Sequence, residues 1–379
     1  MIKIGIRNNL LYPLLFVLFL GIRRIIKLIL ERCIDIDCPF LLAFSMFFSH
    51  FIFGGISLFY LNRKRKKNGN SKVIGITLIR TEKELNRQDS DLKIILLMIL
   101  AAFIELIGAI VRRYAIKKFC NKEEEGEKIN TKLRSFEIII SSLLSYLILH
   151  IKIYRHHLVT LVIIGACLIC GFIIEICKVE LKIFWKSILI LIISTLSRAF
   201  LDIIEKHLFD KDFIDVFKIT TFEGFCDTIL ISFSYFFEAP RKEITNLFNL
   251  GKGDKLLAFI LLIIYGVLSF YKYIYRRCTL IEYSPMTRAL AESVFDPFII
   301  IYYFIDAKKF SLGEYAYFIS FFILSIIMVF CSCVYNEFLV LYFCDMEHDT
   351  YIEINKREEK ERNTYDNNEE ENMEKMNDI

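Results

Sequence analysis

The sequence predicts an all-α membrane protein, with ten transmembrane helices arranged as two inverted five-helix repeats. Hydrophobic residues make up 55% of the 379 positions, and the mean hydropathy is +0.46. Several apolar runs reach the roughly 20 residues that a helix needs to cross ~30 Å of hydrocarbon. Only 5 prolines and 15 glycines are present, which is typical of long helices joined by short loops.

Two hairpins of similar pattern, Arg134–Cys177 and Tyr283–Tyr342, suggest the repeat. In the first, two apolar runs are joined by a tight basic turn, Lys152–His157. Because each half would hold an odd number of helices, the halves would have opposite orientations in the membrane. We expect a first repeat at 1–180 with a basic loop at 62–92, a second repeat at 181–345, and a disordered polar tail at 346–379.

The first apolar run follows Lys3 and Arg7, as in a signal sequence, but no small-residue cleavage site comes after it. We therefore expect a retained helix rather than a removed peptide. The ten helices are expected at about Leu10–Leu30, Pro39–Leu61, Leu92–Val111, two within 134–177, Phe184–Ile204, Ile219–Phe237, Leu256–Tyr275, Pro285–Ile305 and Leu312–Tyr335.

The placement of charge predicts the orientation and the partners. Ten Lys or Arg residues lie between Arg63 and Lys93, so this loop is expected in the cytosol, and with ten helices both termini are expected there too. The net charge is only +4, and basic residues gather in loops, which favours contact with anionic lipid over nucleic acid. The expected partners are the lipid bilayer and a small-molecule solute. Homodimer formation, and the choice between endomembrane and plasma membrane, stay open.

Four segments carry a resemblance to a known family. They are SSLLSYLILHIKIYRHHLVTLVIIGACLICG, DIIEKHLFDKDF followed by TTFEGF, YSPMTRALAESVFDPFIIIYYFI, and VYNEFLVLYFC. With these segments the chain resembles the drug/metabolite transporter superfamily, as a divergent member near the nucleotide-sugar-transporter-like solute carriers. The resemblance covers most of residues 90–345. It implies ten helices, two five-helix repeats and transport by alternating access, and it leaves the substrate open.

The most informative polar pattern begins the ninth expected helix. Ser284 is placed as an N-cap and is followed by a proline at the first helical position. Arg288, Glu292 and Asp296 then recur every four residues on one face, and Pro297 would loosen the helix beside Asp296. This face is expected to line a polar cavity, with a structural Arg288–Glu292 pair as the alternative.

The same four-residue spacing recurs in the sixth and seventh expected helices, with Arg198 and Asp202 in one and Glu223 and Asp227 in the other. The expected topology places these residues and Arg288 in the cytosolic half of the membrane. There they could form a salt-bridged gate, or offer arginines to an anionic substrate. Since acids outnumber bases among them, we favour the gate.

Glu105 is the single acid of the third expected helix. It could bind and release a proton during a transport cycle, or it could be hydrogen-bonded to a neighbouring helix as a structural group. Both interpretations stay open.

The remaining features indicate no enzyme, metal or cofactor. Adjacent histidines such as His156 and His157 do not converge on one ion, and no Asp, Glu or Cys stands near them in the sequence, so we expect a plain interfacial turn. Small residues on the fifth helix, Gly165, Ala166 and Gly171, are expected to allow close packing. The predicted function is secondary transport of a small polar solute, anionic or nucleotide-linked. The alternative is a non-transporting membrane scaffold or receptor on a transporter fold.

Overall fold

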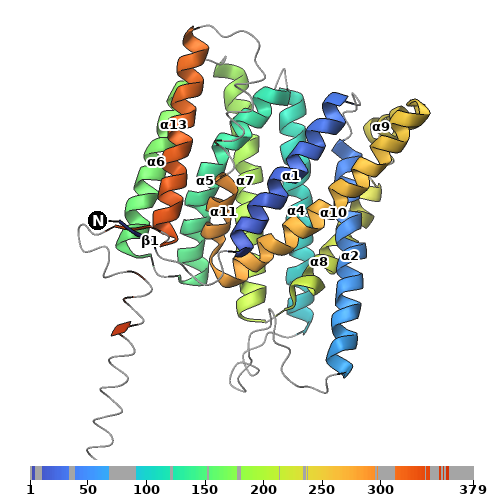
Figure 1. Cartoon of the computed structure of the whole chain (residues 1–379), viewed down its shortest axis with the longest axis horizontal. Coiled ribbons are helices and arrows are strands. Elements are labelled where there is room, and N and C mark those ends of the chain that lie inside the picture. The colour runs from blue at the N-terminus through green and yellow to red at the C-terminus, as the bar shows by residue number, and fades with distance from the viewer. Residues whose placement is uncertain are drawn as a thin grey trace, which may run out of the picture.

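The computed structural model describes residues 2–4, 11–33, 39–67, 91–119, 123–151, 153–176, 181–212, 214–233, 236, 238–294, 297, 312–337, 339–341, 350, 353 and 356–357. Within these ranges the chain is almost entirely helical (Figure 1). The helices are α1 (Leu11–Cys33), α2 (Pro39–Lys67), α4 (Asp91–Phe119), α5 (Glu123–Leu149), α6 (Arg155–Ile176), α7 (Leu181–Asp210), α8 (Val216–Phe233), α9 (Glu238–Asn249), α10 (Lys252–Glu282), α11 (Pro285–Ser293) and α13 (Leu312–Tyr335).

Each of the ten expected helix positions holds a helix, but several ends differ from the prediction. Helix α2 continues to Lys67 and α4 to Phe119, so parts of the expected charged loops are helical. Lys, Arg and Glu are good helix formers, and hydropathy alone ends a helix too early where they follow an apolar run. The rest of the expected loop, residues 68–90, lies outside the described residues, as do Cys38, Asp296 and most of the expected tail.

The ninth expected helix is described only in part. Helix α11 ends at Ser293, whereas the apolar pattern predicts a helix to Ile305. Pro297 is again helical, and as a proline it has no backbone N–H to donate to the carbonyl of Ser293, four residues earlier. Residues 295–296 and 298–311 lie outside the described residues.

The helices pack in pairs across the molecule. Helix α2 lies against α8 and α10, α4 against α7, α1 against α10, and α6 against α13, while α5 contacts α7 and α11 (Figure 1). Two glycines permit the close approach to α2. A Cβ at Gly224 would lie 2.5 Å from Phe51 N, and one at Gly266 would lie 2.1 Å from Ser49 Oγ. The glycines expected to allow tight packing on the fifth helix have ordinary contacts, at 3.9 Å for Gly165 and 3.5 Å for Gly171.

Helix α9 was not predicted, and it supports the beginning of α2. The backbone N–H groups of Phe40 and Leu41 donate to Glu243 Oε2, at 2.8 and 3.3 Å. These N–H groups have no partner within their own helix, and a carboxylate placed there also suits the helix dipole. A residue on α9 therefore caps a helix about two hundred positions away in the sequence.

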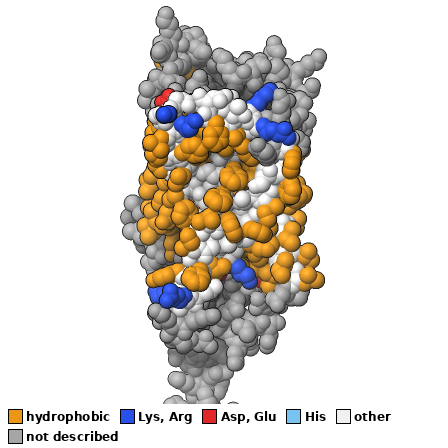
Figure 2. Space-filling view, turned by 90° about the vertical axis from the view of Figure 1, so that its right-hand side faces the viewer, with side chains coloured by type: hydrophobic (Ala, Val, Ile, Leu, Met, Phe, Trp, Pro, Cys, Tyr) orange, Lys and Arg blue, Asp and Glu red, His pale blue; other side chains and the backbone are white. Residues whose placement is uncertain are grey.

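The outer surface carries many exposed large apolar side chains, among them Phe59, Leu256 and Ile263, each more than 60% exposed. On the side of the molecule where α2 and α10 lie, Figure 2 shows a broad apolar area with Lys and Arg at its upper and lower edges. Among the described residues, three helices are long and apolar enough to cross a membrane: Phe40–Lys64, Lys252–Glu282 and Phe318–Tyr335. These features are those of a membrane protein.

Two short strands were also not predicted. Residues Ile2–Ile4 (β1) pair antiparallel with Leu339–Leu341 (β2), with Ile2 opposite Leu341 and Ile4 opposite Leu339. The pairing places the first residues of the chain beside the segment that follows α13 (Figure 1).

Candidate functional site

The candidate site is a connected network of buried ion pairs at the meeting point of five helices. All of its members except Arg198 are less than a tenth exposed. The network contains four arginines and five carboxylates: Glu137 on α5, Arg198, Asp202 and Glu205 on α7, Glu223 on α8, Arg276 and Arg277 on α10, and Arg288 and Glu292 on α11.

Two neighbouring arginines of α10 form one end of this network. Arg277 is fully buried; it lies 2.9 Å from Glu205 Oε1, donates to Thr220 Oγ1, and contacts Glu223. Arg276 donates to Asp202 Oδ1 at 2.6 Å and lies 3.0 Å from Glu205 Oε2. Since buried charges are costly unless they are paired and hydrogen-bonded, this geometry explains how α10 accommodates two adjacent arginines.

The other end joins α5, α7 and α11. Arg288 contacts Asp202 and Glu137, and it lies 3.1 Å from Glu292 Oε2. Arg198 lies between Glu292 and Glu137, at 2.7 and 3.1 Å from their carboxylate oxygens. Asp202 connects the two ends, because it contacts both Arg276 and Arg288.

The local sequence of α11 explains how its charged face is held. Ser284 caps the helix as predicted, accepting a hydrogen bond from Thr287 N at 3.2 Å, and Pro285 occupies the first turn. Thr287 also donates to Asn336 Oδ1 at 2.6 Å, which ties α11 to the end of α13. The expected Arg288–Glu292 pair is present, and both residues also bind partners on α5 or α7.

Glu105 is not an isolated carboxyl. The hydroxyl of Tyr273 donates to Glu105 Oε1. The Tyr273 ring in turn lies 4.3 Å from the His50 ring, and the cations of Lys272 and Arg276 lie 4.8 and 5.5 Å from its centroid. Tyr273 therefore stands between Glu105 and the ion-pair network. The interpretation of Glu105 as a structural group required a hydrogen bond to a neighbouring helix, and Tyr273 on α10 provides it.

The other two predicted site residues are Asp227 and Asp296. Asp227 is fully buried on α8, one turn beyond Glu223, and neither of its carboxylate oxygens has a hydrogen-bond partner among the described residues. Asp296 lies outside the described residues. Of the eight predicted residues, the structure thus brings together Arg198, Asp202, Glu223, Arg288 and Glu292, and it places Glu105 nearby through Tyr273.

Four members of the network were not predicted. Arg276 and Arg277 follow Tyr275, where the apolar pattern and the expected helix end, whereas α10 continues to Glu282. Glu205 lies three residues after Asp202 on the same helix, a spacing that could have identified it. Glu137 stands near the expected start of its helix, and no local signal links it to residues on α7 and α11.

The first turn of α6 lies apart from the network. His156 is buried, and the rings of His156 and His157 lie 4.0 Å apart. The structure also brings Glu337, which follows α13, to 3.6 Å from His156 Nε2. A carboxylate distant in the sequence therefore joins the two histidines, which the sequence did not indicate.

No protein-family model matches the chain, and no curated protein matches it. What the site can do chemically therefore has to be inferred from its own residues. In the network every arginine contacts at least one carboxylate, and guanidinium–carboxylate pairs of this kind hold helices together until a competing ligand or a movement separates them.

Proposed function

We propose that this chain is a divergent member of the drug/metabolite transporter superfamily, a multi-pass secondary transporter that moves a small polar solute by alternating access. The observation that carries the proposal is the buried ion-pair network, which links Glu137 of the expected first repeat to arginines of the expected second repeat. Ionisable groups are expensive inside a membrane protein, and they commonly mark substrate or ion pathways.

The pattern of helix packing supports an inverted repeat. If the helices are taken in two groups of five, α1, α2, α4, α5 and α6 correspond in order to α7, α8, α10, α11 and α13. If each helix of a contact is replaced by its counterpart, the contact should occur again in the structure. The α4–α7 contact corresponds in this way to α10–α1, α5–α6 to α11–α13, and α2–α10 to α8–α4, and all six contacts are present. The pairs α2–α8, α5–α11 and α6–α13 map onto themselves and also exist. The contacts of α7 with α10 and α11, and of α8 with α10, have no comparable counterpart among the described residues, but most of the larger contacts follow the exchange, as a two-fold internal repeat would produce.

The paired strands support the part of the expected topology that places both ends of the helical region on the same side. An even number of spans returns the chain to the side where it began. The antiparallel pairing of β1 with β2 holds residues 2–4 beside 339–341, after the last helix of the second repeat.

Within this transporter the network acts as a gate. Arg198 and Arg288 each contact Glu137 on α5 and an acid on α7 or α11, so separating the two repeats on this side would require breaking their pairs with Glu137. Once separated from Glu137, the guanidinium groups could bind a phosphate or carboxylate of the solute bidentately. This favours an anionic solute, phosphorylated or nucleotide-linked.

Uptake by the purified protein in liposomes tests the proposal, with nucleotide sugars, nucleotides, amino acids and polyamines as candidate solutes. We expect saturable uptake of one anionic class, and a changed rate in Asp202→Asn protein that still folds. Glu353→Gln, which removes an acid from an exposed pair with Lys356, is the matched control and should leave uptake unchanged. Protein that folds but moves none of these solutes would favour the scaffold or receptor instead.

A further inference from the structure

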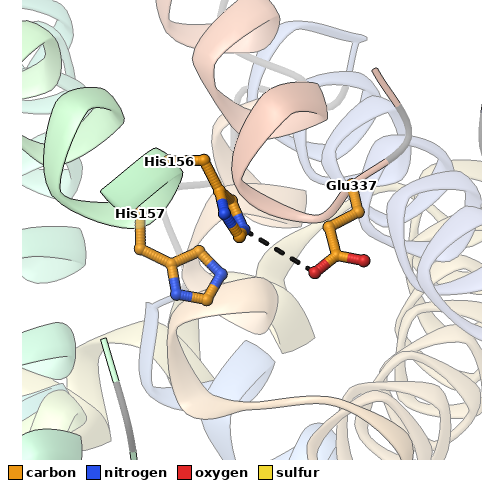
Figure 3. A group of neighbouring side chains, drawn as sticks. All are labelled: His156, His157 and Glu337. Atoms are coloured by element: carbon orange, nitrogen blue, oxygen red, sulfur yellow. Dashed lines mark ion pairs between the residues drawn. The ribbon is translucent and has the colours of Figure 1, made fainter. Parts of the chain in front are cut away.

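The second cluster of chemistry-bearing side chains lies where the first turn of α6 meets the end of α13. Helices α6 and α13 pack side by side (Figure 1), which brings His156 and His157 to Glu337. Figure 3 shows the His156 ring and the Glu337 carboxylate turned toward one another, with the His157 ring beside them. One ligand atom from each of the three residues lies within 4.8 Å of the other two.

The backbone on both sides of the cluster is fixed by local structure. Glu337 has a φ of 59°, a left-handed conformation that Gly or Asn would adopt more easily. Its N–H donates to Val334 O at 3.1 Å, and the preceding residue, Asn336, is anchored by Thr287. Glu337 is thus held at the end of α13 in a conformation that an ordinary helix end would fill with glycine.

We propose that His156, His157 and Glu337 bind a divalent transition-metal ion of the Zn²⁺ type, and that the ion joins the hairpin of α5 and α6 to the end of α13. Two imidazoles and one carboxylate, with a water molecule in the fourth position, are a common zinc ligand set. The two nitrogen ligands favour such an ion over Mg²⁺ and Ca²⁺, which prefer oxygen.

The distances fit an ion after a small adjustment. Zinc lies about 2.0–2.2 Å from N and O ligands, so tetrahedral ligand atoms lie about 3.3 Å apart. His156 Nε2 and Glu337 Oε1 are already 3.6 Å apart, and the other ligand-atom separations, all within 4.8 Å, can be shortened by side-chain rotation. The cluster is partly shielded, with side-chain exposures of 4% for His156 and 18% for Glu337.

The ring of His157 is positioned by contacts with two tyrosines, Tyr154 and Tyr335. Its Nδ1 accepts from Tyr154 N at 3.3 Å, a long hydrogen bond that the ion would replace. The ring of Tyr335, tilted by 31° and centred 4.2 Å from that of His157, packs against the imidazole and holds it in place.

Metal binding by the full-length chain tests the proposal and requires no transport assay. The purified protein, stripped with a chelator, is titrated with Zn²⁺ in detergent by calorimetry, and its melting temperature is followed with and without Zn²⁺. We expect one saturable site and a raised melting temperature. His156→Gln and Glu337→Gln should each weaken the affinity by roughly tenfold or more, and excess Mg²⁺ should not compete.

Two further variants separate loss of the site from loss of folding. Glu337→Gly suits the left-handed backbone while it removes the carboxylate, so this variant should fold well and still lose Zn²⁺ binding. His150→Asn is the matched control, because His150 is exposed near the same turn with a φ of 53° and lies outside the cluster. The proposal is overturned if stripped protein shows no saturable Zn²⁺ binding, or if binding persists at unchanged affinity in Glu337→Gly.

Discussion

Arg198 on α7 lies 3.1 Å from Glu137 on α5, and this pair joins the two expected repeats inside the molecule. Each partner has another: Arg198 also contacts Glu292, and Glu137 also contacts Arg288. The contact between the repeats is therefore a cluster of four charged residues, and each side chain contacts two side chains of opposite charge within it. If one carboxylate is removed, each arginine still keeps another carboxylate partner. The contribution of a single pair can therefore be tested by substitution.

Replacing Glu137 with Gln should loosen the contact between α5 and the second repeat while the protein still folds. Arg198 keeps Glu292, and Arg288 keeps Asp202 and Glu292. Charged hydrogen bonds contribute about 1.5–3 kcal/mol each, so the separated state should gain roughly tenfold or more in population. Hydrogen–deuterium exchange of α5 and α7 in detergent measures this, and it should be faster in the variant.

The control for this variant is Glu353→Gln, which neutralises an acid in an exposed pair. Its exchange in α5 and α7 should match the unaltered protein. Equal exchange in Glu137→Gln would show that the pair does not hold the repeats together.

Arg277 presents the opposite case, because its removal leaves Glu223 without an arginine partner among the described residues, while Glu205 keeps Arg276. Glu205 and Glu223 both contact Arg277, and all three side chains are nearly inaccessible. Breaking a buried pair in this way costs about 3–5 kcal/mol. Arg277→Gln should therefore lower the melting temperature strongly. Lys218 is an exposed cation on α8, so Lys218→Gln should leave the melting temperature unchanged. A melting curve unchanged by Arg277→Gln would contradict the assignment of Arg277 as a structural centre of the network.

The contrast between helix positions and network members shows what the sequence can predict. Apolar runs of about 20 residues are a local property, so all ten expected helix positions hold helices. The helix ends were wrong where charged residues continue the helix, as at Lys67 and Glu282. Helix α9 was missed because it is short and polar, and its role as a cap for α2 depends on a tertiary contact.

The same distinction between local patterns and tertiary contacts applies to the residues of the site. Four-residue spacing identified Arg198 with Asp202 and Arg288 with Glu292, because residues on one helix face can be found from sequence alone. The pairing of Glu137 with Arg198 and the approach of Glu337 to His156 depend on how distant helices pack. No local pattern contains that information.

Glu105 gives a prediction about coupling. If it carries a proton during transport, uptake by liposomes should respond to an imposed pH gradient, and Glu105→Gln should remove that response while uptake down the solute gradient persists. Tyr273→Phe, which removes the donor to Glu105 and keeps the ring, should change the pH at which the response occurs. Uptake that ignores the gradient in the unaltered protein would leave Glu105 as a structural partner of Tyr273.

The close approach of α2 to its neighbours makes a prediction that does not depend on function. A Cβ at Gly266 would lie 2.1 Å from Ser49 Oγ and 2.9 Å from Ser45 O, and one at Gly224 would lie 2.9 Å from the His50 carbonyl carbon. Rotation of Ser49 could relieve the first contact, but the backbone atoms of α2 cannot move alone. Gly266→Ala and Gly224→Ala should each destabilise the protein by about 1–3 kcal/mol, measured as a lower melting temperature in detergent.

Gly253→Ala is the control, because a Cβ there meets no atom within 4 Å, and its gain in helix propensity should leave stability equal or higher. Equal melting temperatures for all three variants would mean that α2 is packed less closely against α8 and α10 than the structure shows.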